Sequence, residues 1–159
     1  MKKNLLFVSF LLSLSCSIFG QISHGGQPYV WNQKELSTAI PFVQMDPIDL
    51  ARLQMEDAVT DQYKDLPYRF GYEFSTNISM ENAGRKFQAQ DGTGREIWQV
   101  GIACPGALSM SLRFDAYRIP KGGEVFIWTA DRKAFLGSFN HLNNRADKVL
   151  PCGLLHGDR

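Results

Sequence analysis

The stretch that decides the fold class is residues 108–115, LSMSLRFD. Hydrophobic and polar residues alternate strictly along it, and its hydrophobic positions are Leu108, Met110, Leu112 and Phe114. Successive side chains of a β-strand point to opposite faces, so a period of two is typical of a strand with one buried and one solvated face. Residues 108–115 therefore predict a half-buried β-strand.

Neighbouring segments carry similar patterns. Further strands are expected at Trp98, Val100 and Ile102, at 125–128 and 135–139, and as a leading strand at Phe70, Tyr72 and Phe74. Turn-forming residues separate them at 91–94, 105–106, 120–123 and 131–133. Short strands joined by such turns predict an all-β fold, an antiparallel, jelly-roll-like β-sandwich of six or seven strands over residues 67–159.

Residues 1–20 have the three parts of a secretory signal peptide. Two lysines follow the initiator methionine, an apolar stretch comes next, and small residues lead to cleavage before Gln21. The apolar stretch is shorter than the about 20 residues that a membrane-spanning helix needs. The alternative is a lipoprotein modified at Cys16, although Ser13 stands where that motif usually has an aliphatic residue. We expect a secreted or periplasmic protein with no membrane attachment after cleavage.

Residues 21–66 are expected to form an extended arm with one short helix. Glycines and prolines interrupt the first half of this region, which shows no sustained period. Asp46 followed by Pro47 predicts the start of a helix, because Asp caps helices well and Pro suits the first helical position. The apolar stripe of that helix is modest, so we expect weak docking.

Charge excludes two classes of partner. The chain has 17 Lys and Arg against 16 Asp and Glu, a formal net charge of +1. Binding to nucleic acid driven by bulk charge is therefore disfavoured. No run of five or six like charges occurs either, which argues against a polybasic membrane tether.

No motif predicts a catalytic, cofactor-binding or metal-binding residue. The sequence lacks a Gly-rich phosphate loop, HExxH, GxSxG and CxxC. His24 lies in the expected arm, His141 in a loop rich in Asn, and His156 close to the C-terminus, so none is expected to be a general base. The weakest alternative is a stand-alone hydrolase that uses His141. We therefore assign no catalytic site to this chain.

Two cysteines, Cys104 and Cys152, remain after removal of the leader. In an oxidising compartment a bridge between them would close a long loop, worth about 4 kcal/mol by chain entropy. Two unrelated buried thiols are the other interpretation, and the sequence leaves both open.

The aromatic residues offer a binding hypothesis. On the face of a sandwich, a stacking platform for sugars could be formed by Tyr68, Phe70, Tyr72, Phe74, Trp98 and Trp128. They occupy alternating positions, so we favour core packing. The alternative function is a secreted β-sandwich module that binds glycan or protein.

Several motifs, taken together and in order, resemble a known family. They are Asp49-Leu50 leading to Glu56-Asp57, PYRFG at 67–71, WQVGIACPGA at 98–107, SLRFDAYRIPKGG at 111–123, VFIW at 125–128, GSF at 137–139, Asn143-Asn144, Leu150-Pro151 and Gly157-Asp158. This series is similar to the N-terminal region of secreted trypsin-like serine endopeptidases of the lysyl endopeptidase type. Cys104 is a departure, because the signature there usually carries Ser.

The resemblance implies a non-catalytic role. In such precursors this region precedes the protease domain, whose catalytic triad would lie beyond Arg159. Leu154 and Leu155 resemble a strand entering a turn, so we expect the sandwich to be incomplete at its C-terminus. The partner implied is a downstream protease domain of the same precursor, absent from this chain, which this domain would help to fold or restrain.

Overall fold

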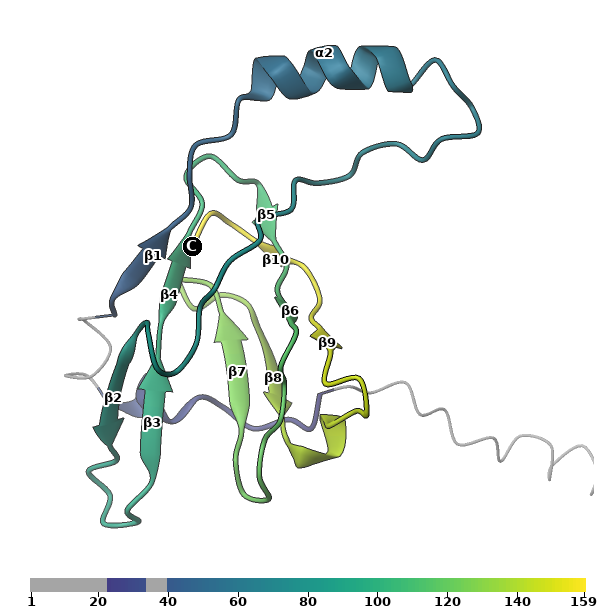
Figure 1. The fold of residues 1–159 in the computed structure, drawn as a ribbon. Helices are drawn as coiled ribbons and strands as arrows, with labels where there is room; N and C mark the ends of the chain where they lie inside the picture. Colours follow the sequence, from purple (N-terminus) through teal and green to yellow (C-terminus); the bar gives the residue numbers. More distant parts are fainter. Residues whose placement is uncertain (1–22, 34–39) are drawn as a thin grey trace, which may run out of the picture.

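A computed structural model describes residues 23–33 and 40–159 (Figure 1). The expected signal peptide at 1–20 and its alternative at Cys16 lie outside these residues. The described elements, in order, are η1 (Tyr29–Asn32), β1 (Phe42–Gln44), α2 (Leu50–Thr60), β2 (Arg85–Gln88), β3 (Glu96–Gln99), β4 (Gly101–Ala103), β5 (Ser109–Met110), β6 (Arg113–Phe114), β7 (Val125–Trp128), β8 (Phe135–Phe139), η2 (His141–Asn143), β9 (Leu150–Pro151) and β10 (Leu155–His156). Strands predominate, which confirms the all-β class.

The strands pair two by two. Antiparallel pairs are β2–β3, β5–β10, β6–β9 and β7–β8, and β1–β4 is parallel. The described strands do not close into a barrel. A parallel pair needs a long connection, and here α2 and the hairpin of β2 and β3 lie between β1 and β4 in the sequence.

Residues 108–115 are extended as predicted, but they form two short strands, β5 and β6. Between them the Leu112 carbonyl accepts a hydrogen bond from the Cys152 amide at 2.8 Å, and β9 and β10 lie opposite. The segment is thus one interrupted antiparallel ribbon. The expected alternation is wrong at Leu108, which lies before β5 and is 89% exposed.

Two turns behave as their sequences predict. The Asp91 carboxylate accepts the Thr93 amide at 3.0 Å in the turn between β2 and β3. The Asp131 carboxylate accepts the Thr129 hydroxyl at 2.7 Å and the Lys133 amide at 3.1 Å between β7 and β8. These hydrogen bonds lower the pKa of Asp131 to about 2, and the hydrogen bond from Thr129 has the largest effect.

A small core lies between the ribbon and the hairpin of β7 and β8. Tyr117, Phe139 and Leu150 are its buried members. Half-buried side chains that pack against it are Phe114, Ile119, Val125, Ile127, Leu136 and Cys152. Hydrophobic residues of four strands, β6 to β9, therefore meet in one cluster.

Residues 23–33 of the expected arm dock on the β-structure. The His24 amide donates to Ser138 O at 2.9 Å, and the Ser138 amide donates to Gly25 O at 2.9 Å. The Trp31 ring lies edge-on against Trp128, with centroids 6.4 Å apart. Together with β1, this segment docks on strands that come much later in the sequence.

Two expectations about the region before residue 85 are wrong. Phe70, Tyr72 and Phe74 form no leading strand, and residues 67–79 contain no strand. No neighbouring strand pairs with them, and an alternating pattern alone cannot form a sheet. Strand β1 was not expected, because its three residues follow Pro41 in a region without a period.

Candidate interaction surface

Helix α2 begins at Asp49, not at Asp46 as the sequence predicts. The Asp49 carboxylate accepts the Arg52 amide at 3.0 Å, which satisfies one of the free amides at the helix start. Asp46 does not cap the helix because the backbone just before it still continues the pairing of β1 with β4. The Met45 amide donates to Ala103 O at 2.8 Å.

The helix and the chain that returns from it form a projection, defined here as residues 46–72 (Figure 1). Its contact with the body is small. Within α2 only Leu53 is buried, and residues 61–73 are all exposed. The weak docking expected from the modest apolar stripe is confirmed.

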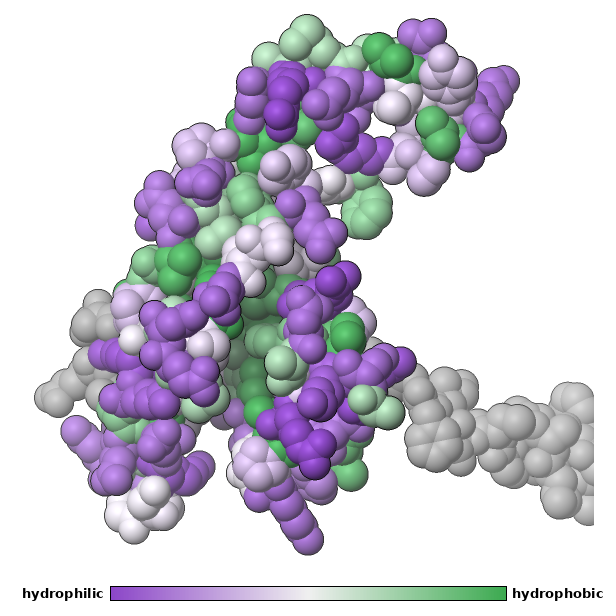
Figure 2. Space-filling view, viewed as in Figure 1, coloured by the Kyte–Doolittle hydropathy of each residue, from purple (hydrophilic) through white to green (hydrophobic). Residues whose placement is uncertain are grey.

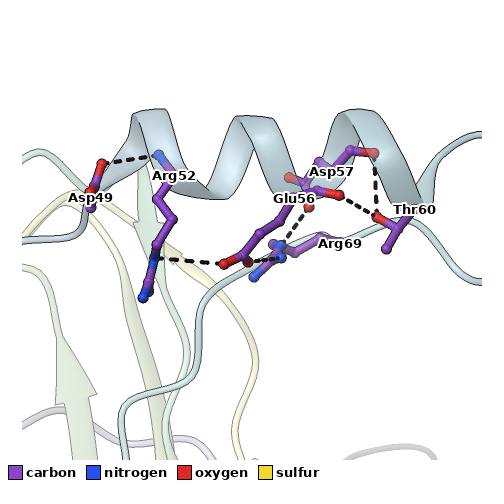
Figure 3. Close-up of polar contacts among 6 residues, drawn as sticks. All are labelled: Asp49, Arg52, Glu56, Asp57, Thr60 and Arg69. Carbon is purple, nitrogen blue, oxygen red and sulfur yellow. Dashed lines mark hydrogen bonds and ion pairs between the residues drawn. The ribbon is translucent and has the colours of Figure 1, made fainter.

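A network of charges holds the two limbs of the projection together (Figure 3). Arg69, on the returning limb, donates to Asp57 at 2.7 Å and to Glu56 at 2.8 Å, both on α2. Arg52 lies 3.6 Å from Glu56, one helical turn away. The hydrogen bond to Asp57 and then that to Glu56 raise the pKa of Arg69 above its usual value. One guanidinium therefore clamps two carboxylates, a geometry that Lys cannot reproduce.

The projection is rich in exposed hydrophobic side chains (Figure 2). They are Leu50, Met55, Val59, Tyr63, Leu66, Tyr68, Phe70 and Tyr72. Large apolar side chains gathered on one exposed feature mark an interaction site more often than single ones do. This surface is the strongest candidate site in the described structure.

The six aromatic residues of the sugar-binding hypothesis do not gather on one surface. Core packing, which we favoured, is wrong for Tyr68, Phe70 and Tyr72, which are exposed on the projection. Trp98 and Trp128 are half-buried in the body. The Trp98 indole donates to Ala83 O at 2.7 Å, and Trp128 packs against Trp31.

The histidines lie on three different segments of the fold. His24 is on the docked N-terminal segment, and His141 begins η2. His156, in β10, lines a shallow depression of about 560 Å³. The other residues around it are Ile40, Phe42, Thr129, Ala130, Asp131, Gly157, Asp158 and Arg159. The Asp131 carboxylate there accepts hydrogen bonds from Thr129 and Lys133 of its own turn.

The two cysteines are free thiols in the structure. Cys104 is buried after β4, and its amide donates to Asp158 O at 2.8 Å. Cys152 follows β9 and packs against the core, where burial raises the pKa of its thiol to about 11. A disulfide between Cys104 and Cys152 stays a prediction.

Over residues 23–33 and 40–159, no three His, Cys, Asp or Glu side chains gather in a way that could hold a metal ion. In the same ranges, no helix combines the length and the hydrophobicity needed to cross a bilayer.

Sequence reasoning missed the role of Arg69. Glu56 and Asp57 were noted only as part of a family-like motif, whereas the structure pairs both with a residue 12 or 13 positions later. An acidic pair on a helix followed by a lone Arg in a segment rich in aromatic residues was the available signal. Neither a family model nor a solved structure matches this chain.

Proposed function

We propose that this chain is the non-catalytic N-terminal domain of an exported serine endopeptidase precursor, which helps to fold or restrain a trypsin-like protease domain of the same precursor. The resemblance of residues 45–159 to lysyl endopeptidase precursors supports the proposal. Secretion follows from the expected signal peptide, and N-terminal sequencing of the exported protein should begin at Gln21.

The observation that carries the proposal is the convergence of the first family-like motifs. Asp49, Glu56, Asp57 and Arg69 belong to two separate motifs in the sequence. In the structure they cap α2 and clamp its two limbs. These motifs thus maintain one feature, the projection, whose exposed apolar side chains need a partner.

The chemistry of the projection defines what it would contact. Residues 46–72 contain six acidic residues and three basic ones. Glu56 and Asp57 are neutralised by Arg69, so the surplus acids lie toward the ends of the projection. An apolar groove with a basic rim on the protease domain would match both properties.

Two experiments test the proposal. The first reads the nucleotide sequence beyond Arg159, where a reading frame without a trypsin-like His, Asp and Ser set would count against it. The second refolds the protease domain from denaturant with and without an equimolar amount of this chain. We expect the chain to raise the yield of active enzyme, or to inhibit the folded enzyme.

Matched variants locate the effect. Leu50→Ser, Met55→Ser and Val59→Ser together change the projection, and all three side chains are exposed, so folding should be retained. The control combines Leu108→Ser, Leu142→Ser and Leu154→Ser, which are exposed on the body. Only the first set should abolish the effect. An equal loss with both sets would place the contact elsewhere.

A second candidate function is binding of glycan or protein through aromatic side chains. Tyr68, Phe70 and Tyr72 are exposed on the returning limb, and this observation favours it. Co-sedimentation with insoluble polysaccharides tests it, with Tyr68→Ala, Phe70→Ala and Tyr72→Ala as the variant. Tryptophan fluorescence is a poor reporter here, because Trp98 and Trp128 pack in the body.

The finer architecture is also a proposal. A jelly-roll-like antiparallel sandwich is supported by four antiparallel pairs and by the cluster between the ribbon and the β7–β8 hairpin. An experimental structure of the domain together with the protease domain would decide whether the strand pairs extend into two continuous sheets.

A further inference from the structure

We propose that the returning limb of the projection is a proteolytic processing site, cut between Phe70 and Gly71 by an endopeptidase that accepts a large aromatic side chain. We further infer that the two fragments remain associated after the cut. Neither statement depends on the function proposed above.

The backbone of this limb is available to a protease. Residues 67–78 have no regular secondary structure and, among the described residues, make no hydrogen bonds between backbone groups. Proteases bind their substrates as extended strands, through backbone hydrogen bonds that a folded segment has already used. Exposed segments of this kind are the preferred sites of nicking.

The side chains define the specificity. Phe70 is fully exposed, and Tyr68 and Tyr72 flank it at alternate positions. Gly71, on the amide side of the bond, has no neighbour within 4 Å of where a Cβ would lie. Phe70, on the carbonyl side, is fully exposed, so both residues of the bond are open to solvent. The hydrophobic primary specificity pocket of a protease could therefore bind the Phe70 side chain without any change in the fold.

The neighbouring clamp presents the bond to solvent. Arg69 is fixed by Asp57 and Glu56, which holds the limb beside α2. In an extended chain Arg69 points away from Phe70, so the clamp leaves the aromatic side free. Hydrolysis would break the C–N bond, adding a hydroxyl to the Phe70 carbonyl and a hydrogen to the Gly71 nitrogen, both from water.

Contacts across the cut keep the fragments together. The N-terminal fragment would retain β1, which pairs with β4, and the segment whose His24 and Gly25 bond to Ser138. Trp31 would remain against Trp128 and Phe135, with ring centroids 6.4 and 5.3 Å apart. The Arg113–Glu73 pair, at 3.9 Å, would hold the new end of the other fragment.

The test treats the full chain with a small amount of chymotrypsin under native conditions and identifies the products by intact mass. The first cut should fall at Phe70–Gly71, and both fragments should co-elute in gel filtration and separate only in denaturant. The variant Tyr68→Ala, Phe70→Ala, Tyr72→Ala should be cut at least about tenfold more slowly. Exposed sites that remain, such as Tyr63, Leu66 and Leu108, have backbone groups that are already hydrogen-bonded and must open before a protease can bind them.

Leu108→Ala is the control, since Leu108 is an exposed chymotrypsin site on the body. Its first cut should be unchanged in place and rate. Far-UV circular dichroism confirms that each variant is folded. First cuts in the body, at Phe42 or Leu142 for example, would overturn the processing site. Fragments that separate without denaturant would overturn the association.

Discussion

Replacing Gly137 with Ala should destabilise the domain through the pairing of β7 and β8. Gly137 has φ +116°, a conformation that L-residues avoid. A Cβ built there would lie 2.6 Å from Val125 O and 3.2 Å from Phe126 Cα, both backbone atoms of the partner strand. Because neither can rotate away, the strands would have to separate.

The expected cost has two parts. Holding a residue with a side chain in this backbone region costs about 1–3 kcal/mol. Forcing a methyl group into filled space costs about 1–3 kcal/mol more. The sum, about 2–6 kcal/mol, is a large part of the about 5–15 kcal/mol that stabilises a typical domain.

Gly122→Ala is the matched control. Gly122 also has positive φ, +91°, but nothing lies within 4 Å of its Cβ position. It should therefore show the conformational cost alone. Urea unfolding followed by tryptophan fluorescence gives both free energies of unfolding, and the Gly137 variant should be less stable than the control by about 1–3 kcal/mol. Equal losses at the two positions would refute the steric argument.

Three further predictions concern the core, the clamp and the buried thiol. Leu150→Ala should lower the free energy of unfolding by about 2–5 kcal/mol because Leu150 is 3% exposed. Leu154→Ala, at an exposed position, should change it by less than about 0.5 kcal/mol. A similar loss in both variants, measured by urea unfolding, would contradict the core assignment. Arg69→Ala should change the free energy of unfolding by less than about 1 kcal/mol but accelerate amide hydrogen exchange in α2, because the clamp is lost. Lys64→Ala, on the same projection, should leave α2 exchange unchanged. Unchanged exchange in the Arg69 variant would show that the clamp is dispensable. Burial raises the pKa of Cys152 from 9.0 to about 11, so the folded state holds this proton more tightly than the unfolded state, and stability should fall as pH rises from 9 through 11. In a plot of the urea midpoint against pH, Cys152→Ala should flatten the range from pH 9 to 11. A decline above pH 10 should remain because burial raises the pKa of Tyr117 to about 12. An unchanged slope between pH 9 and 11 would argue against the buried thiol.

Local patterns predicted β6, β7 and β8, whose side chains meet the core, but not β9, which supplies Leu150. The segments 125–128 and 135–139 are β7 and β8 with the same bounds. The turn between them was recognised because Asp131 supplies its own hydrogen bonds. In these places the sequence neighbours and the spatial neighbours are the same residues.

The remaining features depend on contacts that the sequence does not place side by side. Phe70 and Tyr72 alternate like strand residues, but no strand lies beside them. Strand β1 exists because Gly101–Ala103 offers it an edge. The clamp between Arg69 and α2 depends on the path of the intervening loop, so no local pattern pairs Arg69 with Glu56 and Asp57.

The docking of the first described residues onto β8 has a consequence for how quickly this chain can fold. The Ser23 hydroxyl donates to Gly137 O, a partner 114 positions away. Closing so long a loop costs chain entropy before any contact repays it, and topologies rich in such contacts fold slowly. During synthesis the first part of the chain emerges well before its partner strand. It must therefore stay unpaired until β8 appears. This delay prolongs the time during which the unfolded chain can be exported, bound by a chaperone or aggregate.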